Sequence, residues 1–74
     1  CELARSELLR HMTERGLFER DGWRVYEFTR EVEGRTELVM RPVHTNIETP
    51  HDLECVCKVD QDNRSVSADC TNGA

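Results

Sequence analysis

One helical pattern at the start of the chain is followed by patterns of alternating residues, and this order restricts the fold more than any other feature. Apolar residues repeat every fourth position at Ala4, Leu8 and Met12, which is the spacing of one face of an α-helix. Gly16 then stands where helices commonly end in a left-handed residue. The sequence therefore predicts one amphipathic helix over residues 3–15, with strands after it.

The first expected hairpin occupies the middle of the chain. Residues 23–32 and 35–41 are rich in aromatic and β-branched side chains and flank the two-residue turn Glu33-Gly34, as two antiparallel strands typically do. Such a turn fixes the register of the strands. It predicts one apolar and one oppositely charged cross-strand pair: Phe28 with Val39, and Arg30 with Glu37.

A second expected hairpin lies near the end of the chain, after a connector. The connector, residues 42–52, holds Pro42 and Pro50, which break regular structure. Apolar and polar residues then alternate over residues 53–59 and 66–70, the period of a strand with one buried face. Together these patterns predict an α+β fold in which one N-terminal helix packs on an antiparallel sheet of about four strands.

The size of the chain limits its core. A domain of about 60 residues buries only about 60% of the surface that its unfolded chain exposes, and this chain of 74 residues is little longer. Its residues are 36% hydrophobic and 34% charged, so we expect a thin core. Residues 1–74 are expected to form a single domain, and because the chain starts at Cys1 instead of Met, we expect it to be a fragment of a larger protein.

Composition and motifs disfavour several functions. The net charge is −5, whereas nucleic-acid-binding domains are usually basic. The longest uncharged apolar run, Leu38–Met40, is far shorter than the roughly 20 residues of a membrane-spanning helix. The sequence shows no glycine-rich phosphate loop and no nucleophile elbow. We therefore expect no nucleic acid, no membrane span, no cofactor and no enzymatic activity.

The four cysteines allow more than one interpretation. Free, buried cysteines that act as small hydrophobic residues are the preferred one. Cys55 and Cys57 are spaced about 6.5 to 7 Å apart along one strand face, too far for an easy bridge, whereas Cys55 and Cys70 can form a disulfide across the hairpin. A zinc site would combine these cysteines with His44 or His51, but the paired C-x2-4-C spacing of structural zinc sites is missing.

A glycosylation motif supports an extracellular alternative. Asn63-Arg64-Ser65 matches the acceptor for N-glycosylation and lies on the turn expected between the last two strands. Disulfides are likewise typical of exported domains. The alternative is thus an extracellular receptor or ligand module, held by disulfides among its four cysteines and glycosylated at Asn63.

The order of features in residues 6–42 matches a pattern known from other proteins. In chain order it contains Ser6-Glu7-Leu8-Leu9 in a helix, a Gly16-Leu17 exit, Trp23 and Tyr26-Glu27-Phe28 in a strand, and a strand ending in Pro42. This order resembles the middle of Ras-association domains, which have a ubiquitin-like fold. It resembles a winged-helix segment nearly as closely. The first resemblance implies an interaction module. That family places a hairpin before its helix to bind the GTPase, so no GTPase-binding residue is carried over.

An uncovered apolar face gives the leading functional hypothesis. Both faces of the first hairpin carry apolar side chains, while a single helix is expected to cover one of them. We therefore expect a non-catalytic protein-protein interaction or regulatory module, active in cytoplasmic signalling, that binds another protein or a second copy of itself. The contact would be made through a strand edge or through the uncovered face, with these residues: Tyr26, Phe28, Val39 and Arg41.

Overall fold

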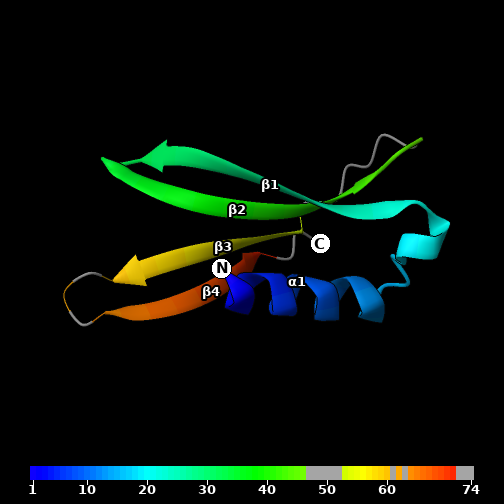
Figure 1. Ribbon diagram of the computed structural model, residues 1–74, viewed down its shortest axis with the longest axis horizontal. Coiled ribbons are helices and arrows are strands. Elements are labelled where there is room, and N and C mark those ends of the chain that lie inside the picture. Colours follow the sequence, from blue (N-terminus) through cyan, green and yellow to red (C-terminus); the bar gives the residue numbers. More distant parts are fainter. Residues whose placement is uncertain (47–52, 61, 63, 72–74) are drawn as a thin grey trace.

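A single helix packs on one face of a four-stranded antiparallel sheet (Figure 1). The computed structural model describes residues 1–46, 53–60, 62 and 64–71. In chain order the elements are α1 (Glu2–Glu14), the 3-10 helix η1 (Glu19–Asp21), β1 (Trp23–Val32), β2 (Arg35–His44), β3 (Glu54–Asp60) and β4 (Ser65–Thr71). The strands lie side by side in this order, which confirms the predicted α+β architecture. Neither described helix is long and apolar enough to cross a membrane.

Helix α1 has the apolar stripe and the end that its sequence predicts. Ala4, Leu8 and Met12 are its buried residues. The backbone N–H of Leu17 donates to the Met12 carbonyl at 2.8 Å, and Gly16 adopts a φ of 72°, the left-handed conformation that glycine takes without steric cost. The reversal at Gly16 turns the chain back toward the sheet.

The core lies between α1 and the sheet. The stripe of α1 packs on Met40, Leu53 and Cys55, which are also buried. The expected inner face of the first hairpin, with Trp23 and Leu38, packs against the same cluster. Helix α1 lies over β2, β3 and β4, and its backbone does not approach β1. The helix therefore reaches the first strand through side chains alone, such as Arg5, which pairs with Glu27 at 3.7 Å.

The first hairpin forms in the predicted register. Phe28 stands opposite Val39, and Arg30 stands opposite Glu37. The turn residues Glu33-Gly34 have φ values of 50° and 77°, as a two-residue type I′ turn requires. The local twist of this turn matches that of the strands, so the turn type and the cross-strand pairs support the same register.

Strand β2 is longer than predicted, because Pro42 does not end it. β2 continues to His44, with Pro42 opposite Val25. Backbone bonds between the two strands fall on alternate pairs, and the bond from the Thr45 N–H to the Gly22 carbonyl at 3.3 Å places Pro42 between two bonded pairs. The missing N–H of Pro42 therefore costs no bond to β1, and the predicted connector starts later.

The two hairpins meet over a short junction. Strands β2 and β3 pair only at Leu38 with Cys57, Val39 with Val56, and Met40 with Cys55, whereas β3 and β4 pair along their whole length. Figure 1 shows the two hairpins diverging from this junction toward their tips. The pairing between β2 and β3, in the middle of the sheet, is thus the shortest of its three strand pairings.

One disulfide joins the two strands of the second hairpin, and another joins the start of α1 to β3. Cys55 and Cys70, directly opposite each other with Cα atoms 4.0 Å apart, form one bridge, and Cys1 and Cys57, with Cα atoms 6.2 Å apart, form the other. No cysteine is free, so the preferred interpretation of four free thiols is wrong. The alternation of β3 turns Cys55 and Cys57 to the same inner face, where one meets β4 and the other meets the start of α1.

Candidate functional site

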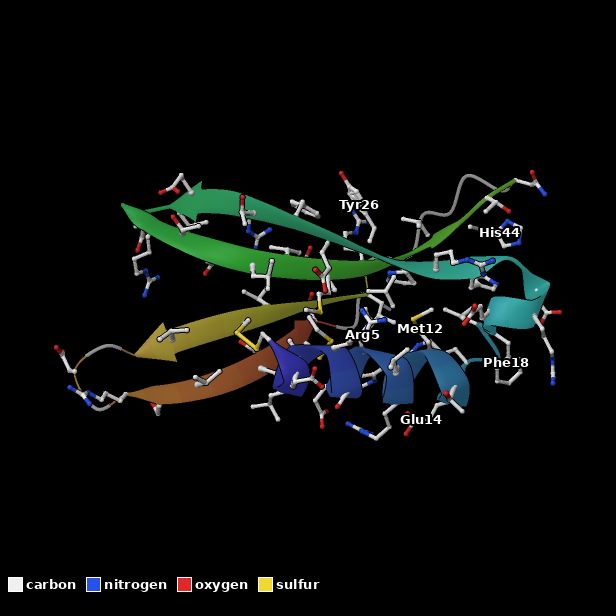
Figure 2. The ribbon with its side chains drawn as sticks, viewed as in Figure 1. Arg5, Met12, Glu14, Phe18, Tyr26 and His44 are labelled. Carbon is white, nitrogen blue, oxygen red and sulfur yellow. A yellow bond between two sulfur atoms is a disulfide. The ribbon has the colours of Figure 1, made fainter. Side chains whose placement is uncertain are left out.

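Two aromatic rings lie together on the face of the sheet that turns away from α1, here called the outer face. The centroids of Tyr26 and Phe28 are 5.6 Å apart, and Tyr26 is 48% exposed. Figure 2 shows Tyr26 pointing away from α1, whereas Met12 points from α1 toward the sheet. Alternate residues of β1 face opposite sides, so a single strand supplies both the core side and the aromatic pair.

The other two residues expected on this surface lie differently. Val39 stands beside Phe28 on β1 and Val56 on β3, and none of its surface is exposed. Arg41 is half-buried and stands opposite Tyr26. Val39 thus supports the aromatic pair from within the sheet, while Tyr26, Phe28 and Arg41 reach the surface.

An arginine links three strands across the outer face. The Arg30 guanidinium binds Glu37 on β2 at 3.1 Å and Glu54 on β3 at 3.4 Å. Along the sheet these carboxylates lie on either side of Val39, which is fully buried. Exposed ion pairs of this kind contribute about 0 to 1 kcal/mol each. The main effect is therefore to fix the positions of the side chains around the rings.

No described element covers the outer face. Helix α1 and η1 account for the described helices, and α1 packs on the opposite side. Val43 on β2, which is also on the outer face, is 39% exposed. Apolar and aromatic side chains that remain open to water on a rigid sheet are typical of contact surfaces. This face is the candidate functional site.

Neither the side chains that lie close enough to share a metal ion nor the cysteines considered above for zinc offer the necessary ligands. Glu7, His11 and Cys70 come within 4.8 Å of one another, but the Cys70 sulfur is held in a disulfide and offers no thiolate. The Glu7 carboxylate binds Arg10 at 2.7 Å, and this hydrogen bond lowers the pKa of Glu7. The other cysteines proposed for zinc are likewise in disulfides.

The histidine expected near the cysteines has a structural role. His44 Nε2 contacts the Asp21 carbonyl at 2.7 Å, and its Nδ1 accepts a hydrogen bond from the Asn46 N–H at 3.0 Å. Both contacts are satisfied by a neutral ring that carries its proton on Nε2, so His44 ties the end of β2 to η1. His51 and Asn63, the residue expected to be glycosylated, lie outside the described residues.

Two hollows on the surface bring no reactive groups together. One, of about 330 Å³, lies between α1 and the start of β1 and includes Met12 and Trp23 in its lining. The other, of about 720 Å³, lies between the hairpin tips and includes Arg35 and Lys58. Neither lining contains a histidine or a free thiol, and so neither offers a Cys-His pair for nucleophilic catalysis.

Comparison with known proteins leaves the site to be judged on its geometry. No protein-family model, no curated protein and no solved structure matches the chain. The resemblance of residues 6–42 to Ras-association domains therefore stays a prediction.

Proposed function

We propose that this chain is a non-catalytic protein-binding module that uses its outer face and works in an oxidising compartment outside the cytoplasm. The observation that carries this proposal is the pair of adjoining rings on a face that no described element covers, with Tyr26 exposed and Phe28 half-buried. Tyrosine and phenylalanine are enriched in protein interfaces because they bury much area at little cost in side-chain entropy. Backbone and cross-strand contacts already hold both rings in place.

The surroundings of the rings favour a partner of mixed chemistry. Val39 and the Arg30 pairs hold the floor of the patch rigid, so that little ordering entropy would be lost on binding. Arg24 and Arg41 flank Tyr26 on the same face. We therefore infer a partner surface with an apolar centre and acidic residues at its rim.

The disulfides favour the extracellular alternative over the cytoplasm. Bridges of this kind persist in oxidising compartments and are reduced in the cytosol. Small domains with thin cores use such bridges to become stable. The positions of Cys1–Cys57 and Cys55–Cys70, between α1, β3 and β4, suit this role.

Intact mass tests the compartment. The protein purified from its natural source, with thiols blocked at lysis, is expected to be about 4 Da lighter before reduction than after it, because each bridge removes about 2 Da. Two bridges would agree with an oxidising compartment. Four alkylated thiols in the unreduced sample would contradict it and return the module to the cytoplasm.

Binding is tested by removing the two rings together. Tyr26→Ser combined with Phe28→Ser is expected to weaken partner capture by about thirtyfold or more, since central aromatic contacts are often worth 2 kcal/mol or more. The measurement is quantitative capture from the compartment that the mass experiment identifies. The matched control is Val59→Ser with Val66→Ser, which removes two residues 61% and 50% exposed from the opposite face. Equal capture by wild type and a folded ring variant would sink the proposal.

A further inference from the structure

The outer edge of β1 is open from Val25 to Glu31, whereas at its start the Trp23 N–H donates to the Phe18 carbonyl at 3.2 Å. β1 pairs with β2 from Trp23 to Val32 without a break in register, and it is the first strand of the sheet. The backbone of α1 lies over the other three strands and reaches β1 through side chains such as Arg5, which pairs with Glu27 at 3.7 Å. β1 contains no proline. A long, regular edge of this kind is a template for pairing with another strand.

The hairpin geometry shows which backbone groups point outward. In a two-residue hairpin the residues that flank the turn exchange both backbone hydrogen bonds, so Val32 points its backbone groups toward Arg35 on β2. The bond from the Thr45 N–H to the Gly22 carbonyl likewise joins an even-numbered residue, Gly22, to the opposite strand. Even-numbered residues of β1 thus bond to β2, and the odd-numbered residues point outward. At Trp23 the N–H already donates to the Phe18 carbonyl at 3.2 Å. The N–H and C=O groups at the open edge are therefore those of Val25, Glu27, Thr29 and Glu31.

We propose that the β1 edge pairs antiparallel with the β1 edge of a second copy of this chain, with Phe28 facing Phe28 across the two-fold axis. The occupant is a second copy because the edge is complementary to itself. Outward-pointing residues must meet outward-pointing residues, so the possible registers differ in steps of two residues. The charges along β1 distinguish among these registers.

The register centred on Phe28 opposes no like charges. It sets Glu27 against Thr29 of the second copy and Arg30 against Tyr26, so that each charged residue faces an uncharged one. It pairs residues 24–32 of each strand. Nearly the whole of β1 therefore contributes backbone hydrogen bonds.

The neighbouring registers are worse. Centring the pair on Glu27 opposes Glu27 with itself and Arg24 with Arg30, and like charges directly opposite each other are destabilising. Centring it on Thr29 opposes Glu27 with Glu31. Centring it on Tyr26 avoids like charges but shortens the pairing to residues 23–29, with η1 standing at the end of the strand.

The dimer would have one continuous sheet of eight strands, counting four from each copy. Even residues meet even residues across the axis, so both helices lie on one side and both outer faces on the other. The two Tyr26-Phe28 pairs then form a single patch at the centre. This inference concerns the edge of β1 and holds whether or not the outer face binds a further protein.

Sedimentation equilibrium of the oxidised chain tests the dimer. The mass is expected to rise with concentration toward twice the 8.6 kDa of one chain. Thr29→Pro removes an outward N–H without touching a bond to β2, and its fixed φ suits an edge strand, so this variant is expected to stay folded and monomeric. Thr29→Val keeps the N–H and is expected to dimerise like the wild type. A wild type that stays monomeric up to about 1 mM, or a folded Thr29→Pro that dimerises equally, would overturn the proposal.

Charge at the same position tests the register. Thr29→Lys would face Glu27 twice in the dimer and is expected to lower the dissociation constant about fivefold, whereas Thr29→Glu is expected to raise it about fivefold. In the Thr29-centred register residue 29 faces itself, so both changes would weaken the dimer, and that result would overturn the proposed pairing. Each variant keeps Tyr26 and Phe28, so loss of the dimer and loss of outer-face binding are measured separately.

Discussion

Replacing Cys1 and Cys57 by alanine is expected to lower the free energy of unfolding by about 4 kcal/mol, because their disulfide closes a loop of 56 residues and so restricts the unfolded chain strongly. A domain of this length has a total stability of roughly 4 to 11 kcal/mol. The double variant is therefore expected to be close to unfolding at room temperature. Urea unfolding followed by Trp23 fluorescence measures the loss.

The choice of this bridge isolates the effect of loop closure. Cys1 is exposed and Cys57 is only partly buried against the core, so their replacement removes less packing than that of the fully buried Cys55. The comparison variant, Cys55→Ala with Cys70→Ala, opens a loop of 15 residues, worth about 3 kcal/mol, but it also removes the fully buried Cys55 sulfur. A loss below about 1 kcal/mol on removing Cys1–Cys57 would show that the bridge does not constrain the unfolded chain.

Leu8→Ala is expected to destabilise the fold by about 3 kcal/mol, within the range of 2 to 5 kcal/mol seen for buried leucines. Leu8 has no exposed surface and lies at the centre of the stripe that α1 buries against the sheet. A thin core has few other side chains to fill the cavity. The measurement is the free energy of unfolding from urea titration, with the disulfides intact.

The neighbouring leucine supplies the control. Leu9 has the same helix propensity but is 43% exposed, so Leu9→Ala is expected to change the free energy of unfolding by less than about 0.5 kcal/mol. If the two variants lost equal stability, the packing of α1 through Ala4, Leu8 and Met12 would have to be abandoned.

Features set by near neighbours were predictable from the sequence. The end of α1 at Gly16 depends on contacts within two turns of the helix. The register of β1 and β2 follows from the two-residue turn Glu33-Gly34, because a turn of fixed length leaves no freedom in the pairing. The wrong prediction at Pro42 has a local cause too. A proline breaks a strand only where its N–H would bond to the neighbouring strand, and Pro42 lies between two bonded pairs, where no such bond to β1 is made.

Features that depend on distant segments were not predictable. Tyr26 and Phe28 were assigned to one face by alternation alone, but the burial of Val39 depends on β3, whose register against β2 no local signal fixes. The Cys1–Cys57 bridge requires the start of α1 to lie over the middle of β3, a consequence of helix placement on the sheet. Spacing between cysteines carries no information on such a contact.

The short junction between β2 and β3 divides the molecule into two halves that are expected to open at different rates. Both bridges lie in the half made of α1, β3 and β4. The β1–β2 hairpin is joined to β3 by three residue pairs and the Arg30–Glu54 ion pair, and to the helix by core packing and the Arg5–Glu27 ion pair. Opening of the first hairpin would expose the core residues Leu38 and Met40 and would leave both bridges closed. Amide hydrogens of β1 and β2 are expected to exchange with solvent through this partial opening. Those of β3 and β4 are expected to exchange more slowly, because their exchange requires the rarer unfolding of the whole chain.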